Sequence, residues 1–176
     1  MKFAILTRRT IAYLIDSLFA FIVFVVVMQT FFFVPIRHLI IGSDDWFRSG
    51  WNTEVYTLVT MSFPTWLYFS LFETFTWQAT IGKHLLKLKT LDKISGNRIT
   101  LFQAIVRTLV KLAPWEIAHL TNNLPVPMLY DPNPSFRIGF IVVPILIMLY
   151  VILASVTQNR QSLHDLIAKT VVIYNG

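Results

Sequence analysis

The sequence predicts an all-α polytopic membrane protein with three or four transmembrane helices and a small cytoplasmic β-hairpin or strand element. The chain has 176 residues, of which 55% are hydrophobic and 14% are charged, whereas soluble domains carry about 25% charged residues. Long charge-free runs recur along the chain, and basic residues collect at their ends. The length fits one compact unit, so we expect a single membrane domain over residues 1–176.

The first charge-free run predicts a retained signal-anchor helix. Residues 17–36 carry no charge, and about 20 apolar residues suffice to cross the ~30 Å hydrocarbon core. Including the turn that holds Asp16, we expect a span over residues 11–34, with Pro35 at its exit. The run is too long for a cleaved signal and no small-residue cleavage site follows it, so we expect the helix to stay in the mature chain.

A polar loop and a second span are expected next. Residues 37–54 contain charged residues and turn formers, which predicts a loop. Residues 55–72 are again free of charge and are closed by Glu73, so we expect a second span over 55–75. Pro64 lies inside this span, where neighbouring groups can satisfy the carbonyl that a proline leaves unpaired.

The stretch 83–100 changes character and predicts a β-hairpin. Apolar and basic side chains alternate over residues 85–91, and Ser-Gly-Asn at 95–97 is a turn signal. Because basic residues favour the cytoplasmic face, the hairpin is expected on that side. The basic residues are Lys83, Lys87, Lys89, Lys93 and Arg98.

Residues 101–122 allow two interpretations. Gln103, Arg107 and Lys111 form a polar stripe on an otherwise apolar helix, and Pro114 is expected to interrupt it. The segment either lies in the membrane interface as a basic amphipathic helix or enters the bilayer with the stripe facing the bundle interior. After a proline-rich loop, the charge-free run predicts a span over 138–158, and the tail predicts a short strand at 170–174.

Charge placement leaves the number of crossings open. With four crossings both termini are cytoplasmic, and ten Lys and Arg residues lie inside against three outside. With three crossings the tail is outside, and the counts are eleven and four. Both arrangements obey the positive-inside rule with a cytoplasmic N-terminus. We favour four crossings, because the tail strand then lies on the side of the hairpin and can pair with it.

Asp16 is the most informative ionisable residue. It lies among apolar residues at the start of a spanning helix, where such groups face the bundle interior or a partner. Arg9 lies two turns earlier on the same face. We expect Arg107 to pair with Asp16 and Asp165 to pair with Arg9. Two roles stay open for Asp16: a proton or cation site, or one half of a buried ion pair that fixes helix packing.

Secondary candidates are weaker. Glu73 ends the second span and is interpreted as a solvated interfacial carboxylate, with a place on an ion route as the alternative. His164 next to Asp165 is interpreted as a capping or tertiary hydrogen bond, with a titrating pair as the alternative. Gly82 and Lys83 do not form a phosphate loop, because the other glycine and the Ser or Thr of that motif are missing.

Several classes of function are disfavoured. The absence of cysteine excludes disulfides and thiol chemistry. No histidine ligand pair, nucleophile elbow or dinucleotide fingerprint is present, so we expect no metal, no cofactor and no enzymatic activity. The formal net charge of +6 sits at the ends of apolar runs, which favours membrane flanking over nucleic-acid binding.

Four motifs in order resemble the RDD-domain family of membrane proteins, over nearly the whole chain. They are Arg-Thr-Ile-Ala-Tyr-Leu-Ile-Asp at 9–16, Thr-Ile-Gly-Lys-His-Leu-Leu-Lys-Leu at 80–88, Gly-Asn-Arg-Ile-Thr with Ala-Ile-Val-Arg at 96–107, and Arg-Gln-Ser-Leu-His-Asp-Leu-Ile-Ala-Lys-Thr-Val-Val at 160–172. The resemblance implies that Arg9, Asp16 and Asp165 are the name-giving residues. The chain departs from the pattern at Lys169, where relatives often have glycine, and in its long proline-rich loop.

The resemblance implies a transport role, because some members of the family are linked to cation/proton exchange. Our first hypothesis is therefore a small multi-pass transporter or exchanger of the inner (cytoplasmic) cell membrane, using membrane-embedded Asp and Arg. The alternative is a non-catalytic accessory or scaffold subunit that binds a partner or anionic lipid. The expected partners are the lipid bilayer and either a second copy of the chain or another membrane protein, with no nucleic acid.

Overall fold

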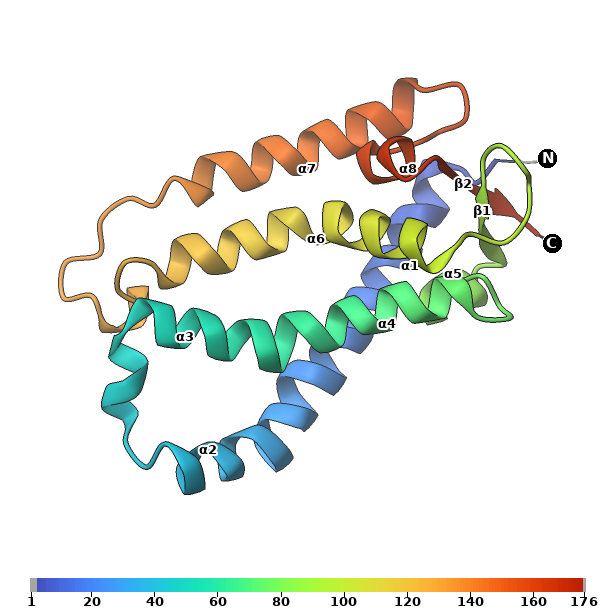
Figure 1. Cartoon of the computed structure of the whole chain (residues 1–176). Helices are drawn as coiled ribbons and strands as arrows, with labels where there is room; N and C mark the ends of the chain where they lie inside the picture. The colour runs from blue at the N-terminus through green and yellow to red at the C-terminus, as the bar shows by residue number, and fades with distance from the viewer. Residues whose placement is uncertain (1–2, 176) are drawn as a thin grey trace. The chain divides into compact units, whose positions relative to one another are not determined.

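The computed structural model describes residues 3–175, most of which are helical (Figure 1). The chain forms two compact units. Unit 1 comprises Met1–Phe19, Trp66–Leu112 and Ile147–Gly176, and unit 2 comprises Ala20–Thr65 and Ala113–Leu146. All of the site residues that the sequence predicted belong to unit 1.

The first helical stretch is longer than expected. It is continuous over Leu6–Ile40 and consists of α1 (Leu6–Ala20), π-helical turns at Phe21–Val27 and Gln29–Phe33, and α2 (Val34–Ile40). The expected span 11–34 lies inside it, but Pro35 does not end it. Pro35 sits in the first turn of α2, where the geometry changes from π to α.

The second stretch is also continuous. It consists of α3 (Gly50–Thr57), a π-helical turn at Leu58–Ser62 and α4 (Phe63–Thr74), and it contains the expected span 55–75 except for its last residue. Pro64 again follows directly on a π-helical turn. The wider turn already shifts the backbone hydrogen bonds, so a residue without an N–H disturbs the helix little.

The interruption expected at Pro114 is wrong, because this proline lies inside helix α6 (Leu101–Asn123). The helix runs through this proline without a break, as helices in apolar surroundings can. Helix α7 (Gly139–Val156) matches the last expected span. Within residues 3–175, two helices are long and apolar enough to cross a membrane, Leu6–Ile40 and Gly139–Val156.

The expectation of a β-hairpin over residues 83–100 is wrong. Residues Ile81–Leu85 form the short helix α5, and β1 (Leu88–Asp92) pairs antiparallel with the tail strand β2 (Thr170–Tyr174), with Thr90 opposite Val172. Only a single bridge joins Leu91 to Arg98. The tail supplies Thr-Val-Val-Ile-Tyr, a run of β-branched and aromatic residues that outcompetes the polar turn as a strand partner.

The tail strand, which the sequence predicted, is flanked on its other edge by the residues that precede α1. The amide of Ala4 donates to the carbonyl of Val172 at 3.0 Å, and Phe3 forms a bridge with Ile173. Ala4, Ala12, Leu88 and Val172 form the small apolar core beside the sheet. The beginning, middle and end of the chain therefore meet in unit 1 (Figure 1).

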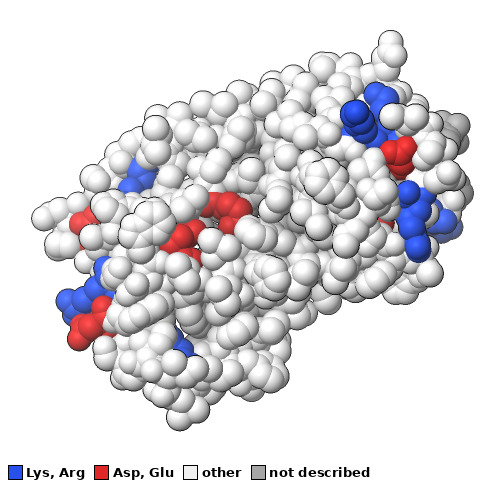
Figure 2. All heavy atoms as spheres, viewed as in Figure 1, with Lys and Arg blue, Asp and Glu red and all other residues white. Residues whose placement is uncertain are grey.

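Apolar side chains point outward while many polar ones are buried. Leu14, Phe31, Phe102 and Phe140 are each more than half exposed, and the face shown in Figure 2 is predominantly uncharged. Fully buried groups include carboxylates, a guanidinium and several threonine hydroxyls. A surface of this kind suits a lipid solvent rather than water.

Two short 3-10 turns and one short helix complete the structure. The turns lie at Asp44–Arg48 and Met128–Tyr130 in unit 2, and α8 (Leu163–Ile167) precedes β2 in unit 1. The loop expected over residues 37–54 is wrong in its last part, because α3 already begins at Gly50. Residues 37–49 contain only the end of α2 and the first 3-10 turn as regular structure.

Candidate functional site: a buried polar core in unit 1

Asp16 lies on α1 and is completely buried. Its Oδ1 accepts hydrogen bonds from the Tyr68 hydroxyl and from the Gly82 amide, each at 2.7 Å. Its Oδ2 accepts from the Thr80 hydroxyl. Among residues 3–175, no Lys, Arg or His nitrogen lies within 4.0 Å of this carboxylate. Asp16 is therefore held by uncharged donors.

Gly82 makes this arrangement possible. A Cβ at this position would lie 2.2 Å from the carbonyl oxygen of Ala12 and 3.0 Å from Cγ of Asp16. Backbone atoms of α1 cannot move aside for it, so any larger residue would push α5 away from α1. The glycine lets the first turn of α5 approach the carboxylate closely enough for its N–H to donate.

Arg107 on α6 joins two other buried carboxylates. Its Nη1 donates to both oxygens of Glu73. Its Nε and Nη2 donate to Oδ1 of Asp165 at 3.0 and 2.7 Å. All three side chains are at most 2% exposed. The planar guanidinium fork suits such bridging, whereas an ammonium could not reach both partners in this way.

The network extends at both ends. Arg9 of α1 pairs with Asp165, and Lys83 of α5 donates to Glu73 at 2.6 Å. The Lys83 ammonium also donates to the Thr90 hydroxyl at 2.8 Å. Burial lowers the pKa of Lys83 to about 8, and the positive charge of Arg107 acts in the same direction against the pull of Glu73. We call Arg9, Asp165, Arg107, Glu73 and Lys83 the ionic network.

The expected pairings are half correct. The pair of Arg9 with Asp165 is confirmed, whereas the pair of Arg107 with Asp16 is wrong. Arg107 is engaged by Glu73 and Asp165, and the oxygens of Asp16 are already occupied by hydroxyl and amide donors. The interpretation of Glu73 as a solvated carboxylate is also wrong, because this residue is 1% exposed and doubly ion-paired.

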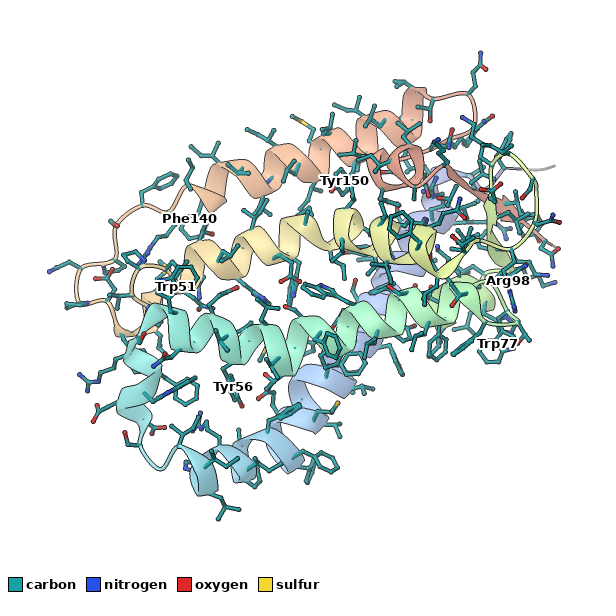
Figure 3. The ribbon with its side chains drawn as sticks, viewed as in Figure 1. Trp51, Tyr56, Trp77, Arg98, Phe140 and Tyr150 are labelled. Atoms are coloured by element: carbon teal, nitrogen blue, oxygen red, sulfur yellow. The ribbon has the colours of Figure 1, made fainter. Side chains whose placement is uncertain are left out.

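His164 and Asp165 open α8. The Asp165 carboxylate accepts from the Ser162 amide at 3.1 Å in a capping box, so the expected capping contact is confirmed. Although burial would raise the pKa of Asp165, Arg9 and Arg107 hold it well below its usual range. Burial keeps the pKa of His164 well below 6.5, against the effect of Asp165. The imidazole packs edge-on against Tyr150, which is labelled in Figure 3.

Lys111 lies one helical turn beyond Arg107 on α6. Its ammonium lies over the ring of Phe69, 3.7 Å from the centroid, and 5.0 Å from that of Tyr13. Cation–π contacts of this kind are worth about 2 kcal/mol when desolvated. Lys111 thus provides a positive charge near the ionic network while its contacts are with aromatic rings.

The sequence pointed to the charged members of this core but not to their neutral partners. Tyr68, Thr80 and Thr90 were missed, because a single hydroxyl in an apolar run has no distinctive pattern. The clearest signal available was Thr80, which lies two residues before the Gly82-Lys83 pair. Within residues 3–175 no group of three His, Cys, Asp or Glu residues is placed to hold a metal ion.

Apolar helices of spanning length, an apolar exterior and a buried ionic core define a helical protein of the membrane class. A family model, the RDD family, matches residues 3–169. The chain therefore belongs to the RDD family, as its motifs indicated. Comparisons with curated proteins and with solved structures gave no match.

Proposed function

We propose that this chain is a four-crossing membrane protein that exchanges protons for cations, with Asp16 as the proton-carrying group. The observation that carries the proposal is the different environment of Asp16 from that of the other two carboxylates of the polar core. Glu73 and Asp165 are both held by cations, whereas Asp16 is held by uncharged donors.

The difference matters for proton transfer. A proton on Glu73 or Asp165 would leave Arg107 with a reduced counter-charge in a buried site, which is costly. A proton on Asp16 breaks no ion pair of the described residues, although the charge of Lys111 also acts on this carboxylate. The Thr80 hydroxyl can rotate and accept from a protonated Asp16, because a hydroxyl is both donor and acceptor. Asp16 can thus change its protonation state while the ionic network stays intact.

Backbone pairing in unit 1 supports four crossings. Ala4, β1 and β2 are joined by backbone hydrogen bonds and therefore lie on one side of the bilayer. The chain must then cross an even number of times between Ala4 and β1, and again between β1 and β2. Leu6–Ile40 and α7 each provide one crossing, so the helical stretch of residues 50–74 and α6 provide the returns.

The distribution of charge supports a cytoplasmic N-terminus. Four crossings place ten Lys and Arg residues on the side of the sheet and three on the opposite side, which the positive-inside rule assigns to cytoplasm and exterior. Four helices enclose little space, so we include assembly into a homo-oligomer of the inner membrane in the proposal.

A second candidate function is favoured by the ionic network. Each of its five members is ion-paired within unit 1, and such networks can serve to fix one packing arrangement. A protein whose polar core is purely structural would act as an accessory or scaffold subunit for another membrane protein.

Ion flux separates the two functions. The purified full-length protein is reconstituted into liposomes with an internal pH dye, and sodium, potassium and lithium gradients are applied. We expect cation-dependent proton flux in the wild type, loss of at least tenfold in Asp16→Asn, and full flux in the matched control Asp45→Asn, whose carboxylate is exposed. No flux from folded wild type, or equal flux in Asp16→Asn, would favour the accessory subunit.

A further inference from the structure

An open groove of about 260 Å³ lies in unit 1, where β1 begins and β2 ends. Trp77, His84, Lys87, Lys89 and Asn175 contribute to its walls. The Trp77 indole stacks on the His84 imidazole with the ring centroids 4.4 Å apart and an interplanar angle of 16°. This stack gives the groove a flat aromatic wall that stays more than 40% exposed at Trp77.

The groove is positively charged. Lys87 lines it from the turn between α5 and β1, and Lys89 lines it from β1. Neither Asp nor Glu is among its lining residues. The groove therefore favours a ligand that carries negative charge.

A second groove, of about 430 Å³, adjoins the first. It is lined by Phe72, Phe75, Thr76, Trp77 and Arg98. Thr76 and Trp77 belong to both grooves. Trp77 and Arg98 are labelled near the same end of unit 1 in Figure 3. Apart from Arg98 and Thr76, the walls of this second groove are aromatic, and Phe75 is more than half exposed.

We propose that the paired grooves bind one anionic phospholipid, with its phosphate at Lys87 and Lys89 and the start of its acyl chains along Phe72 and Phe75. A basic groove that continues into an aromatic one matches a ligand with an anionic head and an apolar body. Trp77 marks the boundary between the two, as tryptophan does at membrane interfaces.

The position along the chain fits this ligand. Phe72 belongs to the last turn of α4, and Trp77 lies three residues beyond the end of that helix. The grooves thus follow a helix that the four-crossing topology brings to the cytoplasmic surface. Anionic lipids attract basic side chains there by about 1 kcal/mol for each Lys or Arg. The inference depends on the membrane placement of α4 and not on ion exchange.

Native mass spectrometry of the purified full-length protein tests the site. Phosphatidylglycerol is titrated against phosphatidylcholine with the same acyl chains, and inorganic phosphate is used as a soluble competitor. The test variant is Lys87→Gln with Lys89→Gln. The matched control is Lys93→Gln with Arg48→Gln, which removes the same charge from residues outside both grooves.

We expect the wild type to prefer phosphatidylglycerol and the test variant to bind it roughly thirtyfold more weakly. The control pair should change the affinity less than threefold, and inorganic phosphate should not displace the lipid. A second variant, Phe75→Ser, leaves the lysines in place and should weaken both lipids.

Three outcomes would overturn the proposal. Equal affinity for phosphatidylglycerol and phosphatidylcholine would mean that the groove does not recognise the charge of the headgroup. An equal loss in the control pair would mean that only net charge matters. Displacement by inorganic phosphate would identify the groove as a site for a free anion. Unchanged melting temperatures of all variants establish that they remain folded.

Discussion

The backbone amide of Gly82 donates to Oδ1 of Asp16 at 2.7 Å, across a gap that no side chain other than hydrogen can occupy. The contact joins α5 to α1 and sets the position of the residues that follow on α5. Lys83, the next residue, reaches Glu73 from this turn. One glycine therefore links the site of Asp16 to the ionic network.

Gly82→Ala is expected to destabilise the protein by about 1–3 kcal/mol, because the new methyl group would overlap the Ala12 carbonyl. Thermal unfolding in detergent measures this effect. Gly42→Ala is the comparison, since a Cβ there has nothing within 4 Å and meets only the cost of its positive φ. A smaller loss at position 82 than at 42 would mean that the α1–α5 contact relaxes easily.

Charge balance in the ionic network predicts unequal effects of its members. Glu73→Gln leaves Asp165 as the one carboxylate of the ionic network to balance Arg107, Lys83 and the partly exposed Arg9, and we expect a loss of about 3–5 kcal/mol. Arg107→Met leaves two cations and two carboxylates still paired, so we expect a smaller loss. Denaturant or thermal unfolding of both variants compares them.

The exposed pair of Asp45 with Arg48 supplies the control for this comparison. Its side chains are 80% and 71% exposed, so Asp45→Asn should change stability little. If Arg107→Met proved more destabilising than Glu73→Gln, the bridging hydrogen bonds of the guanidinium would matter more than the balance of charge.

Stability is expected to rise with pH between about 8 and 10.5. The pKa of Lys83 is lowered from 10.5 to about 8 in the folded protein, so in this window the unfolded chain binds a proton that the folded chain does not. Raising the pH removes that advantage of the unfolded state. We expect a gain of about 1–3 kcal/mol across the window.

If Lys83 causes the rise of stability with pH, replacing Lys83 should reduce that rise. The free energy of unfolding of Lys83→Met should increase less over this pH window than that of the wild type. Lys93→Met, which replaces an exposed lysine, should keep the wild-type slope. Identical pH profiles of wild type and Lys83→Met would contradict the assignment.

The proposed arrangement of four crossings in an inner membrane predicts which positions face each side of that membrane. Because the chain has no cysteine, single cysteines can be labelled without background. Cysteines at Asn97 and Asn175 should react with a membrane-impermeant maleimide only after the inner membrane is opened. Cysteines at Asp45 and Asn133 should react in intact spheroplasts. Labelling of Asn175→Cys in intact spheroplasts would favour three crossings and contradict the proposed pairing of the tail inside the cell.

The sequence predicted the elements whose signal is local. The charge-free runs located Leu6–Ile40 and Gly139–Val156, because a bilayer demands length and apolarity from each helix separately. The tail strand was found from its β-branched run. The helix end expected at Pro35 and the interruption expected at Pro114 were both wrong, because the cost of a proline depends on the geometry of the turn before it and on the surroundings of the helix.

What only the tertiary structure decided is which distant residues meet. The sequence marked Arg9, Asp16, Arg107 and Asp165 as residues needing partners, since a charge in an apolar helix is costly without one. It did not determine that Arg107 takes Glu73 and Asp165 while Asp16 takes hydroxyls and an amide. Likewise the sequence did not determine that β1 pairs with the tail strand β2 rather than with the residues after the turn at 95–97. A partner is chosen by where the packed helices place each side chain, and that position is a property of the whole fold.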